Sequence, residues 1–135
     1  FSVGSMLATR FAAEAAKHFA SIEIVEAHHA NKVDSPSGTA IRTAELIAKS
    51  RDNQPLIVGV DQEARGQIVS GVPIHSLRLS GVSAKQDVLL GGDSELLTIS
   101  HETSSVYAYS AGILASIRFA AANKGLFVGL ETVLA

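Results

Sequence analysis

Cysteine and tryptophan are absent from this sequence of 135 residues, and charged residues make up only 18% of it. Without cysteine the chain can form neither a disulfide framework nor a thiolate metal site, and this fits a reducing compartment, so we expect a cytoplasmic protein. The formal net charge is −2 and no run of Lys and Arg occurs, which argues against a general nucleic-acid binder. No apolar run reaches the roughly 18 residues of a transmembrane helix, so we expect no membrane partner either.

The length suits one compact domain with one core, and a hydrophobic content of 47% can fill that core. Few residues are aromatic or charged, which favours a domain that hides part of its surface in an oligomer. The first residue, Phe1, is not an initiator methionine, so we expect the natural gene product to extend upstream.

Hydrophobic spacing predicts the secondary structure along most of the chain. Leu7, Phe11, Ala15 and Phe19 recur every four residues as one apolar ridge of a first helix, for which Ser5 is a candidate N-cap. "PLIVGV" is a possible short strand in a segment, 51–74, that otherwise reads as a long loop. We predict helices over 5–19, 37–50 and 110–122, and strands over 22–28, 75–81, 86–91 and 95–102. This order predicts an α+β fold whose mixed sheet has about four strands, with helices packed on one face.

The stretch "EAHHANKVDSPSGTA", residues 26–40, closes a strand and opens a helix. Pro36 fits the first helical turn, where its missing N–H costs nothing. Free backbone N–H groups and the helix dipole make such a helix start a ready anion site. Histidine, lysine and hydroxyl groups converge there, which favours a small, doubly anionic ligand such as a dicarboxylate or a phosphate. Histidine can also exchange a proton near neutral pH, so the stretch could form half of an active site.

Simpler interpretations exist for the same residues. An ordinary capped helix start explains Ser37 and Pro36 equally well. We expect no metal site, because adjacent histidines on a strand point to opposite faces and no H-E-x-x-H motif is present. The sequence also lacks the G-x-S-x-G motif of many hydrolases and the lysine of a P-loop. The remaining histidines, His18, His75 and His101, are interpreted as structural.

The same stretch closely resembles the signature of the dihydrodipicolinate reductase family, now called 4-hydroxy-tetrahydrodipicolinate reductases. Its pattern, E-x-H-H-x-x-K-x-D-x-P-S-G-T-A, is filled here at every fixed position. The first residues, "FSVG", resemble the segment in which family members leave their cofactor domain. The last residues, "GLFVGLETVLA", resemble the family's C-terminal tail, so the resemblance covers nearly the whole chain.

The resemblance implies a reductase of lysine and diaminopimelate synthesis that uses NADH or NADPH. Family members have an N-terminal Rossmann domain and a C-terminal domain that binds substrate and forms a homotetramer. Residues 1–135 resemble the second domain only, and 113–135 are expected to return toward the cofactor domain. No G-x-G-x-x-G is present, so the cofactor's pyrophosphate site would lie upstream.

The resemblance also implies roles for individual residues. His28 and Lys32 match the family's acid/base residues. Phe1 matches a residue near the nicotinamide. The contacts to the substrate carboxylates match His29, Lys32, Ser37, Gly38 and Thr39.

Two positions depart from the family pattern. Val106 stands where most members carry an arginine, and Lys85 stands where many have histidine. The loss of the arginine bears on substrate affinity or domain closure. Two alternatives therefore remain beside the reductase: a non-catalytic oligomerisation and anion-binding domain, and a divergent dehydrogenase paralogue with another substrate.

Overall fold

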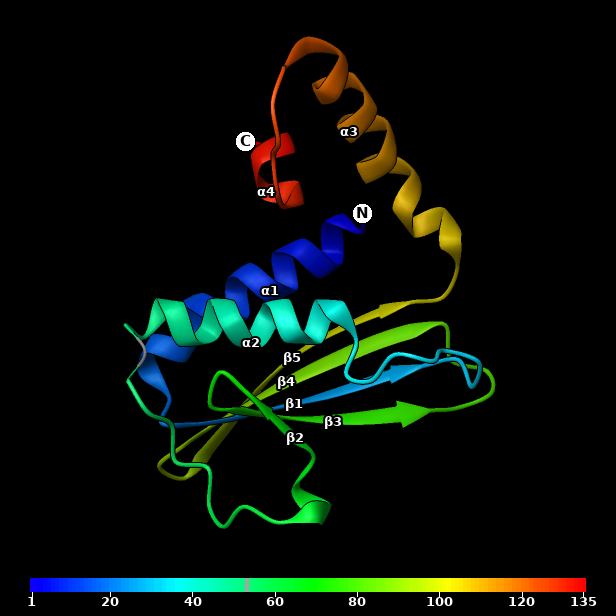
Figure 1. Cartoon of the computed structure of the whole chain (residues 1–135). Helices are drawn as coiled ribbons and strands as arrows, with labels where there is room; N and C mark the ends of the chain where they lie inside the picture. The colour runs from blue at the N-terminus through cyan, green and yellow to red at the C-terminus, as the bar shows by residue number, and fades with distance from the viewer. Residues whose placement is uncertain (53) are drawn as a thin grey trace.

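A five-stranded mixed sheet underlies the computed structural model, which describes residues 1–52 and 54–135 (Figure 1). The strand order is β2-β3-β1-β4-β5. β1 pairs in parallel with β3, and the other neighbours are antiparallel. The strands are β1 (Ser21–His28), β2 (Gln67–Val69), β3 (Val72–Arg78), β4 (Ala84–Gly92) and β5 (Glu95–Thr103).

Two helices, α1 (Val3–Ala15) and α2 (Gly38–Ser50), lie side by side on one face of the sheet (Figure 1). A short 3-10 turn, η1 (Ala16–His18), extends α1. The α+β class, the mixed sheet and the placement of these helices on one face are confirmed. The core between the two layers is aliphatic, and its largest members are Ile22, Ile24, Ile47, Ile74, Val88 and Leu90.

The first helix buries a different face from the one predicted. Phe11 is 55% exposed, whereas Thr9, Ala12 and Ala16 are buried. Small side chains on this face allow α1 to approach α2 closely, and the Thr9 and Thr43 hydroxyls form a buried hydrogen bond of 3.0 Å between them. Of the predicted ridge, Ala15 and Phe19 pack against the core, whereas the prediction was wrong for Phe11, because apolar residues occur on more than one face of this helix.

The start of α1 differs from the expected position, whereas α2 begins within one residue of it, with Ser37 in the capping role that the simpler interpretation gave it. Ser2, not Ser5, caps α1, and it accepts a hydrogen bond from the Ser5 N–H at 3.1 Å. Ser37 caps α2 by accepting from the Ala40 N–H at 3.2 Å, so the buried Pro36 precedes the helix and does not begin it. In each case a hydroxyl satisfies a backbone donor that the first turn leaves free.

The segment 51–74 contains a strand that the sequence pattern did not indicate. Residues 55–60 form no strand, and Ile57 and Val60 are 70% and 77% exposed. β2 instead forms at 67–69, after a short turn η2 (Glu63–Arg65). β3 starts at Val72, earlier than predicted, because its first three residues are all buried and show no alternation. Residue 53 lies outside the described residues.

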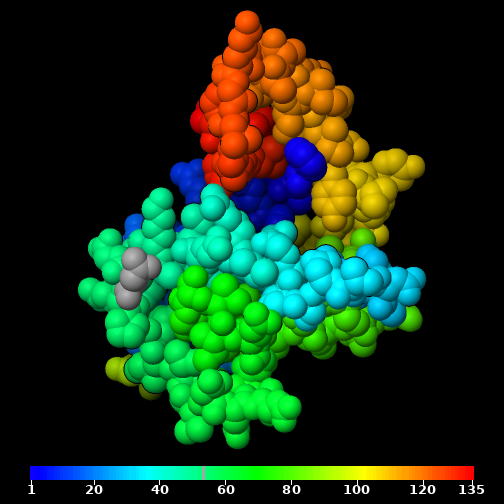
Figure 2. Space-filling view, viewed as in Figure 1, coloured from blue at the N-terminus to red at the C-terminus, as the bar shows by residue number. Residues whose placement is uncertain are grey.

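The C-terminal part stands away from the sheet (Figures 1 and 2). It contains η3 (Val106–Tyr109), α3 (Ser110–Ala122), which matches its predicted bounds, and α4 (Leu130–Val133). Phe119 and Phe127 pack edge to face at 5.0 Å and join the tail to α3. Among the described residues, no helix has both the length and the apolar character needed to cross a membrane.

Candidate functional site

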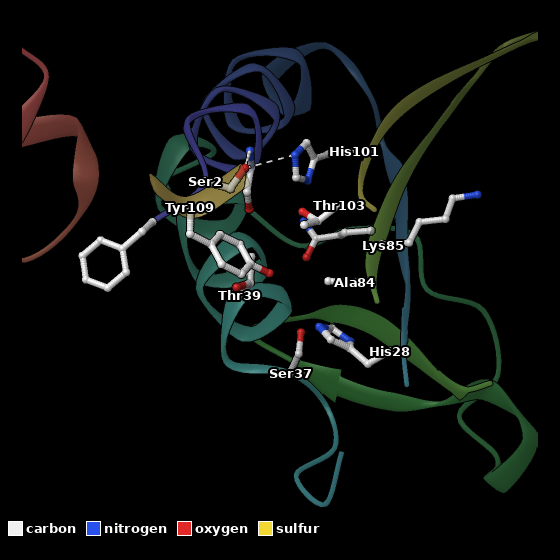
Figure 3. A pocket seen from close by; sticks show the side chains of 12 residues that line it. Ser2, His28, Ser37, Thr39, Ala84, Lys85, His101, Thr103 and Tyr109 are labelled. Carbon is white, nitrogen blue, oxygen red and sulfur yellow. Dashed lines mark hydrogen bonds between the residues drawn. The ribbon is translucent and has the colours of Figure 1, made fainter. Parts of the chain in front are cut away.

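A pocket opens where β1, β4 and β5 meet the starts of three helices (Figure 3). Its cavity has a volume of about 110 Å³. Ser2 and Ser5 come from the first turn of α1, Ser37 and Thr39 from the start of α2, and Tyr109 from the residue before α3. The other lining residues are Phe1, His28, Ala84, Lys85, Gln86, His101 and Thr103.

The lining favours an anion. None of its residues is acidic. The starts of α1 and α2 border the cavity, and the positive end of a helix dipole lies at each of them. α3 continues directly from η3, and its Ser110 N–H is bonded to the Tyr107 carbonyl. In α2, the Ser37 N–H and the Ala40 N–H are occupied by Glu26 and by the Ser37 side chain. The Gly38 and Thr39 N–H groups lack an intrahelical partner because they belong to the first turn.

His28 ends β1 and reaches the pocket from the sheet. Its Nδ1 lies 2.6 Å from Oε2 of Glu26, a fully buried carboxylate. Arg78 binds both oxygens of this carboxylate, with Nη1 and Nη2 each at 3.0 Å. Burial raises the pKa of Glu26, but hydrogen bonds from Arg78, Ser76 and His28 together outweigh it and hold the pKa below its ordinary value. Glu26 is therefore ionised at neutral pH.

Lys32 lies outside the pocket lining, in the loop between β1 and α2. Its Nζ binds Oδ1 of Asp34 at 2.6 Å, and this contact lowers the pKa of Asp34. Arg78 holds the same loop by donating to the carbonyls of Lys32 and Asp34, at 3.3 and 2.7 Å. The structure thus places Lys32 on a loop tied to Arg78, with its ammonium turned to a neighbouring carboxylate.

The other predicted residues are divided between two places. Ser37 and Thr39 line the pocket with His28, and Phe1 lies at its edge with 68% of its surface exposed. His29 follows the strand, is exposed and does not line the pocket. Gly38 lines a neighbouring cavity that Phe1, Ser2 and Thr39 share.

His101 is a pocket residue that sequence reasoning assigned to structure alone. Its Nε2 lies 3.1 Å from the Ser2 Oγ, which joins β5 to the start of α1 (Figure 3). Burial lowers the pKa of His101. Gly4 makes this contact possible, because a Cβ there would lie 2.8 Å from the imidazole. No local signal could have found this pair, because its members are 99 residues apart in sequence.

Gln86 contributes a second unpredicted feature. Its Nε2 donates to Oγ1 of Thr43 at 3.0 Å, and its buried Oε1 has no partner among the described residues. The two departures from the family pattern lie apart. Lys85 lines the pocket, and its Nζ pairs with Asp87 at 3.3 Å. Val106 is 68% exposed in η3. Within the described ranges, no group of three or more acidic or histidine side chains could hold a metal ion.

Comparison with known proteins gives a consistent result. The family model described as "Dihydrodipicolinate reductase, C-terminus" matches residues 4–134. A 4-hydroxy-tetrahydrodipicolinate reductase of Clavibacter sepedonicus is 54% identical over 136 residues, which cover 99% of this chain and 49% of the relative. The enzyme of the same name from Mycolicibacterium gilvum is 45% identical, over 99% of this chain and 56% of the relative.

A solved structure shares the fold. It is a dipicolinate-bound dihydrodipicolinate reductase from Paenisporosarcina sp. TG-14, with a TM-score of 0.83 and 39% identity. The match covers 98% of this chain and 51% of that one. The chain therefore spans about half the length of the relatives that it matches.

Proposed function

The chain belongs to the family of the dihydrodipicolinate reductase C-terminus, and from this premise we propose that it is the substrate-binding domain of a 4-hydroxy-tetrahydrodipicolinate reductase. The full-length protein would reduce a cyclic dicarboxylate of lysine and diaminopimelate synthesis with NADH or NADPH. The names of the relatives and the dipicolinate bound to the structural neighbour support this substrate class.

The observation that carries the proposal is the character of the pocket. The starts of α1 and α2 border a cavity whose lining includes two imidazoles and no carboxylate. Fixed N–H dipoles of this kind bind an anion without reorganising, and their interaction with the anion is stronger where water is excluded. Ser37, Thr39 and the Gly38 N–H are the groups that we propose for one carboxylate. His29 is proposed at the edge of the same site, where it is exposed.

The proton in the proposed reaction comes from His28 or Lys32. His28 already faces the cavity, and its Nε2 lies on the side of the ring away from Glu26. Lys32 is bound to Asp34 and would have to leave that contact to reach a ligand. We propose that the second substrate carboxylate draws the Lys32 ammonium from Asp34, since both partners are anionic and the Asp34 side chain is 56% exposed.

A nicotinamide cofactor would supply the hydride. This chain fits only the edge of its site. Phe1 offers an exposed ring beside the pocket, which suits contact with a flat heterocycle. The sequence has no G-x-G-x-x-G loop to hold a pyrophosphate, so we propose that a preceding domain holds the rest of the cofactor. Residues 113–135, whose tail carries the exposed Leu126 and Val128, are proposed to pack against that domain.

Sheet association is our proposal for the homotetramer. Among the described residues, no α-helix packs on the face of the sheet opposite α1 and α2, where only the short turn η2 approaches (Figure 1). Leu77 on β3 and Leu96 on β5 are 38% and 65% exposed. An uncovered sheet with apolar side chains is suited to pairing with a second copy.

The reductase assay of the full-length protein tests this proposal. We expect NADH or NADPH oxidation that depends on the cyclic dicarboxylate. The same assay with a panel of other cyclic and linear dicarboxylates distinguishes the divergent dehydrogenase, which the exposed Val106 keeps as an alternative. Pyridine-2,6-dicarboxylate binding without turnover of any panel member would instead indicate the non-catalytic anion-binding domain.

A further inference from the structure

Glu26 sits at the centre of a buried network that contacts three parts of the pocket. Its Oε2 binds His28, its Oε1 accepts the N–H of Ser37 at the start of α2 at 3.2 Å, and both oxygens bind Arg78. Arg78 in turn donates to the Lys32 and Asp34 carbonyls. One carboxylate thus connects the imidazole, the Lys32 loop and the helix start.

We propose that Glu26 is a positioning residue, which fixes the orientation and the tautomer of His28. This inference rests on the proposed function, because it assigns His28 as the proton donor. It adds a residue that the chemistry of the pocket alone does not reveal, since Glu26 does not line the cavity.

The tautomer follows from the partners of the carboxylate. The described contacts of Glu26 with Arg78 and Ser37 come from N–H groups that can only donate. An ionised carboxylate cannot donate in return, so Nδ1 of His28 must carry a hydrogen and donate it to Oε2. The Nε2 atom is then the one that gives up or takes a proton on the pocket side. Carboxylate partners orient imidazoles in this way in many acid/base sites.

The same strand offers a matched control. Glu23 lies three residues earlier on β1 and also binds one arginine and one histidine: it pairs with Arg65, and its Oε2 lies 2.6 Å from Nε2 of His75. This second cluster borders a hollow lined by strand residues and lacks contact with the pocket of His28. Substitution of Glu23 therefore removes a comparable ion cluster without touching the site.

The test is a double-mutant cycle on kcat in the full-length enzyme. We expect Glu26→Gln to lower kcat at least about tenfold, because an amide cannot accept at both of its terminal atoms and His28 loses its orientation. In a His28→Gln background the same substitution should change kcat less than about twofold, because residues that act as a unit are not additive. Glu23→Gln should leave kcat within about twofold of wild type in both backgrounds.

A pH profile provides the readout that a purely structural role would not change. Removing the carboxylate charge disfavours an imidazolium beside it, so the alkaline fall of kcat/KM should move to lower pH in Glu26→Gln. The other charged or titratable groups near His28 are Arg78 at the carboxylate, and Lys85, His101 and Tyr109 in the pocket lining. Lys32 and His29, which the proposed function places at the same site, complete this set. All of these side chains are unchanged in this variant.

Glu26→Asp keeps the test decisive if the amide variant does not fold. The aspartate keeps the negative charge beside Arg78, but its carboxylate is one methylene further from His28. We expect kcat to fall at least about tenfold, as in Glu26→Gln. Full additivity of either variant with His28→Gln, or an unmoved pH profile in Glu26→Gln, would overturn the proposal. A wild-type enzyme without reductase activity would instead overturn the proposed function, so the two failures are distinguishable.

Discussion

His28 and His75 each pair with a carboxylate, but on opposite faces of the sheet. His28 pairs with Glu26 at the pocket, whereas His75 pairs with Glu23 on the other face of the sheet. Only the first has a ring nitrogen beside a cavity with no acidic lining residue. The proposed proton transfer therefore uses His28, whereas His75 lies outside the pocket.

We expect His28→Gln to lower kcat of the full-length enzyme by roughly 10²-fold or more, the scale of a positioned acid. His75→Gln is the control, because it removes an imidazole from the same sheet but not from the pocket. Steady-state kinetics at saturating substrate measures the effect. Equal kcat values for wild type and His28→Gln would remove His28 from the chemistry.

His101 should make stability depend on pH. Burial lowers its pKa, so the unfolded chain binds a proton at a higher pH than the folded protein does. The stability gained from neutral His101 is present above about pH 6.5, the ordinary imidazole value, and is lost as pH falls through the folded pKa. Urea unfolding between pH 5 and 7.5 should show a smaller decline for His101→Gln than for wild type. Parallel curves for the two proteins would exclude His101 as the source.

At the scale of elements, the sequence predicted what local patterns determine. The bounds of α3 were predicted correctly, and β1, β4 and β5 lie within one or two residues of their expected ranges. β2 was missed because it has three residues, two of them exposed, and so shows no alternation. Its existence depends on pairing with β3, which is a tertiary property.

The candidate site was predictable only in part. His28, Ser37 and Thr39 lie close together along the chain, and the structure brings them to one pocket. His101 lies on β5, and the pairing of β5 with β4 places it opposite Gln86 and so at the pocket. Arg78 reaches Glu26 from a parallel strand 52 residues later. Neither the contact of Arg78 with Glu26 nor the position of His101 can be recognised from a single sequence.

Gly66 directly precedes the edge strand β2 and lies against β3, so its substitution tests how β2 is held at the edge of the sheet. Its φ is +72°, and a Cβ there would lie 2.4 Å from the Ile74 carbonyl oxygen on β3. Gly66→Ala should therefore lower the free energy of unfolding by about 2 kcal/mol or more, through backbone strain and a clash with main chain. Denaturant unfolding measures this change.

Gly71→Ala is the matched control for Gly66. Its φ is +81°, but nothing lies within 4 Å of a Cβ added there. It should cost only the backbone strain, about 1 kcal/mol. If the two variants lose equal stability, the contact between Gly66 and β3 does not hold the edge strand in place.

At the scale of the whole molecule, two apolar surfaces of the described residues bear on assembly. One is the open sheet face with Leu77 and Leu96, and the other comprises α3 and the tail, with Leu114 and Leu126. The proposed function uses the sheet face for the homotetramer and the α3 surface for the cofactor domain.

Single charged substitutions distinguish these two assignments. Leu96→Glu should convert the tetramer of the full-length protein to smaller species, because a carboxylate cannot be buried unpaired between sheets. The Leu114 side chain is 53% exposed on α3, and Leu114→Glu should leave the tetramer intact. Light scattering coupled to size exclusion gives the masses. A tetramer that survives Leu96→Glu but not Leu114→Glu would reverse the assignment.

We propose that the pocket beside the α2 start binds a dicarboxylate with help from Lys32. Calorimetric titration of the full-length protein with pyridine-2,6-dicarboxylate, in the presence of NADH or NADPH, measures this binding. We expect saturable binding at one site per chain, weakened at least about tenfold in Lys32→Ala by the loss of a charge-assisted contact. No saturable binding by the wild type, or equal affinity for the two proteins, would contradict it.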